Sequence, residues 1–179
     1  ALSIGNRVWF DRNRDGLDDG TDVNPTAGAI DEGIAGVTVQ LLYDANNDGA
    51  INGAELTPIA TDVTDASGYY LFDQTGDQSL ANGGNLLQPG NYIVRIPVSN
   101  FNTGNALADH YSTATLVNAP GNDAPEDNDD NGIDQRDLSL PTLTPIDIDS
   151  ELINLLAYDE TTTEAAGDKG ADGDGRYGI

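Results

Sequence analysis

The sequence predicts an all-β protein with calcium-binding loops. In several short segments, apolar and polar residues alternate with a period of two, and clusters of Gly, Pro, Asn and Asp separate these segments. The twelve-residue calcium-loop pattern D-x-[DN]-x-[DN]-G-x5-E is complete at residues 44–55. Its first six positions recur from Asp11 and from Asp127. We therefore expect short strands joined by ordered, acidic loops.

Composition narrows the class of protein. The chain has 179 residues, a length that suits one large domain or two small ones, and a formal net charge of −24. Nucleic acid and anionic membrane surfaces are poor partners, because there is no basic patch to neutralise phosphates. No segment is apolar enough to insert into a membrane. Without any Cys, the expected staple is calcium, which also neutralises the excess of carboxylates.

The expected strands can be placed in chain order from these alternating segments. They are residues 4–10, 34–43, 58–64, 69–72, 91–97, 138–140, 143–148 and 152–158. In the first, Ile4, Val8 and Phe10 are expected on one side and Trp9 on the other. The last segment fits a short helix equally well by pattern. The loop at 44–55 thus lies between two strands, and not between the two helices of an EF-hand.

The loop at 44–55 has oxygen-bearing residues at the spacing that Ca²⁺ requires. Ca²⁺ takes six to eight oxygens, and Gly49 allows the sharp turn that brings alternate side chains inward. The expected ligands are Asp44, Asn46, Asp48, the backbone carbonyl of Ala50, and Glu55, which closes the loop with two oxygens. The alternative is a solvated turn, since Asn, Asp and Gly are also common turn residues.

Two further loops carry the start of the same pattern. The expected ligands of the first are Asp11, Asn13, Asp15, the carbonyl of Leu17, Asp19, and Asp22 at position 12 by count. Those of the third are Asp127, Asp129, Asn131 and the carbonyl of Ile133. Leu138 occupies position 12 of the third loop, so its closing carboxylate must come from elsewhere, and Asp134 and Asp137 are the candidates. We expect two to three bound calcium ions, or more.

Catalysis is not expected. Almost every Asp lies in a context that calcium binding already explains, and His110, the only His, has no neighbouring Ser or Cys that resembles a nucleophile site. Two function classes stay open. One is an extracellular structural or adhesive protein. The other is a carbohydrate- or protein-ligand-binding module of a secreted adhesin or of a polysaccharide-degrading enzyme.

Residues 1–158 are expected to form the calcium-binding β-domain with long insertion loops, and residues 159–179 a Gly/Asp-rich tail. The strand-like end of this tail, residues 176–179, has two possible positions. It could add to a neighbouring subunit's sheet, which would build a homo-oligomer or filament head to tail, or pack on its own domain. The start at Ala1, without a leader, suggests a secreted product after signal-peptide removal.

Four blocks carry a family resemblance. They are S-I-G-N-R-V-W-F-D-R-N-R-D-G at 3–16, E-G-I-A-G-V-T-V-Q-L at 32–41, T-D-A-S-G-Y-Y-L-F at 64–72 and L-Q-P-G-N-Y-I-V at 87–94. Together they resemble the B-type (SdrD B-like) repeat domains of serine–aspartate repeat surface adhesins. The similarity is good over residues 3–97 and loose over 98–158.

The resemblance implies an immunoglobulin-like, prealbumin-like β-sandwich that is secreted or displayed on the bacterial cell surface and stiffened by calcium. Family members place an acidic residue just before the second strand, which makes Glu32 a second candidate, beside Asp22, for closing the first loop. The function expected from the residues and the resemblance together is a surface stalk, a biofilm-matrix component or a self-assembling filament subunit.

Overall fold

A computed structural model describes residues 4–11, 31–72, 87–110, 132–133, 146–150 and 152–155. The elements in chain order are β1 (Ile4–Arg7), β2 (Trp9–Phe10), β3 (Glu32–Gly33), β4 (Thr38–Tyr43), η1 (Gly53–Leu56), β5 (Ala60–Val63), β6 (Tyr69–Phe72), β7 (Gly90–Ile96), η2 (Val98–Phe101), β8 (Gly132–Ile133), β9 (Ile148–Ser150) and β10 (Ile153–Leu155). In the described ranges, the helices are limited to the two short 3-10 turns, η1 and η2. This part of the chain is all-β, as predicted.

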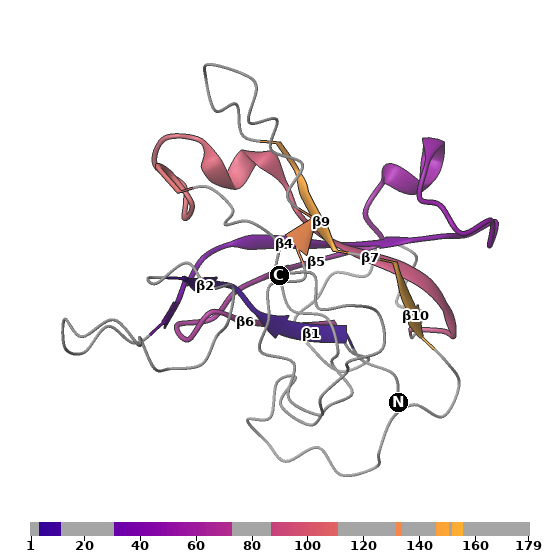
Figure 1. The fold of residues 1–179 in the computed structure, drawn as a ribbon, viewed down its shortest axis with the longest axis horizontal. Coiled ribbons are helices and arrows are strands. Elements are labelled where there is room, and N and C mark those ends of the chain that lie inside the picture. The colour runs from indigo at the N-terminus through magenta and orange to yellow at the C-terminus, as the bar shows by residue number, and fades with distance from the viewer. Residues whose placement is uncertain are drawn as a thin grey trace, which may run out of the picture.

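The larger sheet forms around β4 and β7. Its order is β5-β4-β7-β9-β8, and β10 also pairs with β7. All of these pairs are antiparallel, with Leu41 opposite Val94 and Tyr43 opposite Tyr92. Figure 1 shows η1 projecting from one end of β4 and β7, and η2 lying at the opposite end.

The second layer consists of β1 paired with β6, and a short ribbon of β2 and β3 lies next to it (Figure 1). Side chains from both layers meet in one core, because alternate residues of each strand face inward. The core residues are Ile4, Val8, Val37, Val39, Leu41, Ala60, Tyr70, Phe72, Leu87, Tyr92, Val94, Ile96, Leu107, Ile148, Ile153 and Leu155. The described strands therefore form a two-layered β-sandwich.

The first predicted strand, residues 4–10, is broken at Val8. The Val8 N–H donates to the Gly68 carbonyl (2.9 Å), and the Val8 carbonyl accepts from Ile34 (2.8 Å), so the chain leaves its pairing with β6 and turns toward β3. Ile4 and Val8 are buried, but Phe10, which was expected on the same side of the strand, is 42% exposed. The three side chains do not share one buried side, because the regular pairing of the strand is interrupted at Val8.

Three other predicted strands are found. Residues 69–72 match β6, 91–97 correspond to β7 and 58–64 contain β5. The strand expected at 143–148 shares only Ile148 with β9, and residues 143–145 lie outside the described residues. The strand expected at 34–43 begins only at Thr38, because a turn with Gly36 at φ +78° precedes it. Of the segment expected at 152–158, the structure describes residues 152–155, which contain the strand β10 and no helix. The candidate at 138–140 lies outside the described residues.

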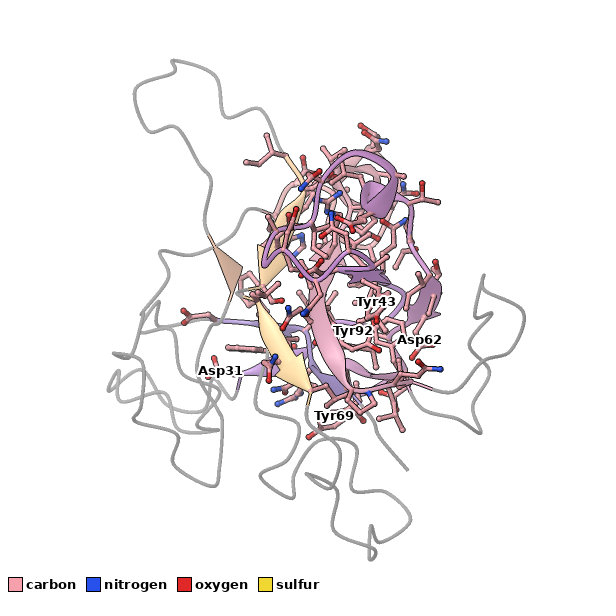
Figure 2. All side chains as sticks on the ribbon, turned by 90° about the vertical axis from the view of Figure 1, so that its right-hand side faces the viewer. Asp31, Tyr43, Asp62, Tyr69 and Tyr92 are labelled. Atoms are coloured by element: carbon pink, nitrogen blue, oxygen red, sulfur yellow. The ribbon has the colours of Figure 1, made fainter. Side chains whose placement is uncertain are left out.

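Tyr92 marks the start of β7 with a feature typical of immunoglobulin-like sandwiches. Its hydroxyl donates to the carbonyl of Gln88 (2.7 Å) and accepts from the N–H of the same residue (3.2 Å). A tyrosine that bonds back to the backbone a few residues upstream is the tyrosine corner of that fold. Its ring also packs on Tyr43, at 5.0 Å between centroids (Figure 2). The corner fixes the turn that enters the strand next to the 44–55 loop.

Candidate calcium site

The loop at 44–55 begins where β4 ends, at Tyr43, and leads through η1 to β5. Its two neighbouring strands pair directly, with Leu41 opposite Ala60. The strand–loop–strand context predicted from the sequence is therefore present. Because the ends of the loop are fixed by the larger sheet, the first and last positions of the pattern are held near each other.

Asp44 is the anchor of the loop. Its side chain is 1% exposed. Oδ1 accepts the Asp48 N–H (3.2 Å), and Oδ2 accepts the Gly49 N–H (2.9 Å). Gly49 has φ +82°, a conformation that L side chains rarely adopt, so glycine is required at this position. The loop folds back over its own first carboxylate, as the spacing of the pattern predicts.

Short polar side chains continue this arrangement along the loop. The Asn46 Oδ1 accepts the Asp48 N–H (2.8 Å), and the Asp48 Oδ1 accepts the Ala50 N–H (3.0 Å). The Asn46 amide also donates to the Asp48 Oδ2 (3.1 Å). The two bonds to backbone N–H groups are Asx turns, in which an Asn or Asp side chain binds the backbone two residues further on. Hydrogen bonds thus link position 3 of the pattern to position 5, and position 5 to position 7.

Glu55 closes the loop. Its Oε1 accepts the N–H groups of Ala45 (3.0 Å) and Asn46 (3.1 Å), and its Oε2 accepts that of Asn52 (3.2 Å). Glu55 lies in η1, whose turn directs the carboxylate back toward the beginning of the loop. The last residue of the pattern is thereby brought against positions 2 and 3, as a closing ligand must be.

The carboxyl of Asp44 is held in its charged form. Burial raises its pKa, whereas hydrogen bonds lower it, the largest from the Asn91 side chain and the others from the backbone N–H groups of residues 47–49. The hydrogen bonds outweigh the burial, and the pKa of Asp44 lies below its ordinary value of 3.8. At neutral pH the loop therefore offers a buried carboxylate anion.

The donor set of this loop fits calcium. Within the described ranges, no three His, Cys, Asp or Glu side chains gather as a metal-binding group. The carboxylates of Asp44, Asp48 and Glu55 accept N–H groups of the loop instead. The Glu55 Oε2 and the two Asp48 oxygens each accept a single hydrogen bond, which leaves a lone pair on each for another partner, whereas the Asp44 Oδ2 and the Glu55 Oε1 already accept two. Carboxylate, amide and carbonyl oxygens are the ligands that Ca²⁺ takes.

The sequence did not reveal the role of Asn91. Its side-chain amide donates to the Asp44 Oδ2 (3.1 Å) and to the Asn47 Oδ1 (3.1 Å), and its backbone carbonyl accepts the Asp44 N–H (3.0 Å). Asn91 belongs to β7, 47 residues from Asp44 along the chain. The sequence feature that could have indicated this role is an Asn at the start of a predicted strand, directly after the Pro89–Gly90 turn.

In the first loop, the structure describes Asp11 and the residues before β4. Phe10 pairs with Glu32 in the antiparallel β2–β3 ribbon, so the same register, continued by one residue beyond the ribbon, sets Asp11 opposite Asp31. Asp31 is 2% exposed, whereas Glu32 is exposed. Asp31, which the sequence analysis did not name, is therefore the buried carboxylate nearest in register to Asp11. Figure 2 shows it well away from Tyr43, which precedes the Asp44 loop.

The remaining predicted ligands of the first loop lie outside the described residues. They are Asn13, Asp15, Leu17, Asp19 and Asp22. Arg7 holds the entrance to this loop: its Nε donates to the Ser67 carbonyl (2.9 Å) and its Nη2 to the Asp31 carbonyl (3.3 Å). The guanidinium thus fixes the backbone on which the buried Asp31 carboxylate is carried.

A family model described as the SdrD B-like domain matches residues 2–114, more than half of the chain. The chain belongs to the SdrD B-like domain family. Neither the curated proteins nor the solved structures include a match. SdrD B-like domains are structural repeats of surface-anchored adhesins and have an immunoglobulin-like, prealbumin-like β-sandwich fold. This SdrD B-like domain is accordingly a structural module of the cell surface, and both the resemblance and the fold class are confirmed.

The family match covers the first loop and the Asp44 loop, and it ends before the third loop. Of the third loop in this SdrD B-like domain, the structure describes Gly132 and Ile133, which form β8 and pair with Ser150 and Asp149 of β9. Its other predicted ligands, Asp127, Asp129, Asn131 and Asp134, lie outside the described residues. No helix in the described ranges is long and apolar enough to cross a membrane.

Proposed function

We propose that this SdrD B-like domain is a calcium-stabilised structural or adhesive module of an extracellular or bacterial surface assembly. The observation that carries the proposal is the Asp44 loop. It presents a complete oxygen-donor set with a buried anion at its first position and a closing carboxylate at its last. Asp44, Asn46, Asp48, the carbonyl of Ala50 and Glu55 would hold the ion.

Calcium binding would act by linkage, because an ion that binds only the folded chain stabilises it. Extracellular modules bind calcium with a Kd of roughly 10⁻⁴–10⁻³ M. At ten times Kd, one site contributes about 1.4 kcal/mol. Three such sites would contribute about 4 kcal/mol, a large share of the ~5–15 kcal/mol by which ordinary domains are stable. Calcium would thereby set the stiffness of a stalk that has no disulfides.

The first loop adds a second site to this proposal. Asp11 opens the pattern, and the closing carboxylate would come from Asp22, from Glu32, or from Asp31 beside Glu32 at the start of β3. Burial favours Asp31, since a carboxylate removed from water is stable only with a compensating charge or hydrogen bonds. A third site, at residues 127–134, rests on the sequence pattern alone.

The test is calcium titration by calorimetry, followed by thermal unfolding in ~mM calcium and in excess chelator. Saturable binding and a higher melting temperature with calcium support the proposal. Asp44→Ala should remove one site from the titration, whereas Asp109→Asn, which neutralises an exposed carboxylate outside the loops, should remove none. Wild-type protein that is free of metal, binds no calcium and melts at the same temperature in both buffers would refute it.

Self-assembly is part of the same proposal. In the described part of the chain, β5 pairs only with β4, and it exposes Val63 to the extent of 53%. An edge strand of this kind can accept a strand from a second copy, which would give a homo-oligomer or a filament with head-to-tail contacts. Sedimentation velocity in calcium and in chelator tests this step. A monomer at all concentrations in both buffers would contradict it.

A further inference from the structure

Asn91 connects the Asp44 loop to the last described strand, β10. Its side-chain Oδ1 accepts a hydrogen bond from the Nδ2 of Asn154 (2.6 Å), which lies directly opposite it in the β10–β7 pairing. Its Nδ2 donates to Asp44 and to Asn47, both at 3.1 Å. A chain of side-chain hydrogen bonds therefore runs from the first position of the loop, through β7, to β10.

Both N–H donors of the Asn91 side-chain amide are in use. One binds the Asp44 carboxylate and the other the side-chain Oδ1 of Asn47, while the amide oxygen accepts from Asn154. Asn91 is 8% exposed, so water does not readily replace these partners. Its orientation is therefore locked, and a movement of the loop changes the contact with β10.

We propose that Asn91 is a positioning residue that couples calcium binding in the Asp44 loop to the docking of β10 on β7. This inference rests on the proposed calcium function of the loop. Asn91 holds the Asp44 Oδ2 in a fixed direction, so less conformational freedom is lost when the ion binds. The same amide holds Asn154, so a loop ordered by calcium also favours the docked strand. Since coupling is reciprocal, a docked β10 strengthens calcium binding by the same factor.

A purely structural role for Asn91 predicts a different pattern. If its amide only satisfies the buried Asp44, its loss lowers stability without changing how β10 responds to calcium. Asn100 provides a matched comparison. It is another buried Asn, 4% exposed, and its amide donates to the Thr38 carbonyl (2.8 Å) and accepts the Thr38 N–H (2.9 Å) at the other end of the sheet.

The first measurement is calcium affinity by calorimetry in wild type, Asn91→Ala and Asn100→Ala. The Asp44 site is identified as the one lost in Asp44→Ala. Residues that orient metal ligands typically contribute 10- to 100-fold in affinity, so we expect Asn91→Ala to weaken this site about 10-fold. Asn100→Ala should change it less than about 2-fold, because Asn100 does not contact the loop. Equal losses in the two variants would overturn the proposal.

The second measurement is amide hydrogen exchange of β10, with calcium and with chelator, in wild type and in Asn154→Ala. Asn154 is exposed, so this substitution cuts the contact to Asn91 without emptying the core, and it serves even if Asn91→Ala does not fold. We expect calcium to slow exchange of the β10 amides several-fold in wild type, and this effect to disappear in Asn154→Ala while calcium still binds.

The two measurements separate this inference from the function on which it rests. If wild type binds no calcium, the proposed function fails, and the coupling fails with it. If wild type binds calcium at the Asp44 site but β10 exchanges at the same rate with and without the ion, only the coupling is overturned. A calcium effect on β10 that persists in Asn154→Ala would also overturn it.

Discussion

Replacement of Glu55 by Gln tests the closing position of the Asp44 loop. The substitution keeps the size of the side chain but removes its charge and turns one acceptor oxygen into an NH₂ group. Both Glu55 oxygens accept backbone N–H groups in the structure. In Glu55→Gln, at least one of these N–H groups therefore faces another donor, and the loop loses the carboxylate proposed to bind calcium through two oxygens.

The magnitude follows from linkage. With calcium at ten times Kd, an intact site stabilises the fold by about RT ln 11, or 1.4 kcal/mol. If loss of the bidentate ligand weakens binding about 10-fold, the same concentration gives only about RT ln 2, or 0.4 kcal/mol. The calcium-dependent stabilisation thus falls by about 1.0 kcal/mol. For a domain of this size, that is roughly 2–4 °C in the difference between the melting temperatures with and without calcium.

The assay is thermal unfolding of wild type, Glu55→Gln and Asp109→Asn, each with calcium and with chelator. In Glu55→Gln, the stability lost with the Glu55 hydrogen bonds is lost in both buffers. The difference between the melting temperatures in calcium and in chelator therefore isolates the contribution of calcium. Asp109 is exposed and has φ 65°, a conformation that Asn tolerates well, so Asp109→Asn controls for the change of one charge. A difference in Glu55→Gln as large as in wild type would refute the assignment of Glu55 as a ligand.

Three other predictions concern the fold and the anion. Tyr92→Phe removes the tyrosine corner and should lower the free energy of unfolding in urea by about 1–3 kcal/mol; an unchanged midpoint would contradict it. Gly68→Ala should cost at least ~2 kcal/mol more than Gly104→Ala, because both glycines have positive φ but only at Gly68 would a Cβ meet backbone, 2.4 Å from the Val8 oxygen; equal losses would refute the close packing. The pKa of the Asp44 carboxyl is lower in the folded chain than its ordinary value of 3.8, so its ionisation adds stability that is fully present above pH 3.8 and is lost as pH falls through the folded pKa. The free energy of unfolding of the calcium-free protein should therefore fall below about pH 4. The fall should be less steep in Asp44→Asn.

The sequence alone determined the parts of this protein that depend on neighbours along the chain. The Asx turns of Asn46 and Asp48, the positive φ of Gly49 and the return of Glu55 all join residues within twelve positions of each other, so a spacing pattern captures them. Alternation likewise predicted β4, because a strand with one buried face repeats every two residues, and the turn signals at 65–68 and 87–90 predicted where β6 and β7 begin.

Only the tertiary structure decided which distant residues complete these local features. Asn91 reaches the Asp44 loop through the register of β7 with β4, and Asn154 reaches Asn91 through the register of β10 with β7. The β2–β3 register, continued by one residue, sets Asp31 opposite Asp11. No short window of sequence contains such a register, which depends on how whole strands align. The break at Val8 has the same origin, since its partners, Gly68 and Ile34, lie on other segments. Local spacing set the ligands of the loop, and strand pairing set what holds them in place.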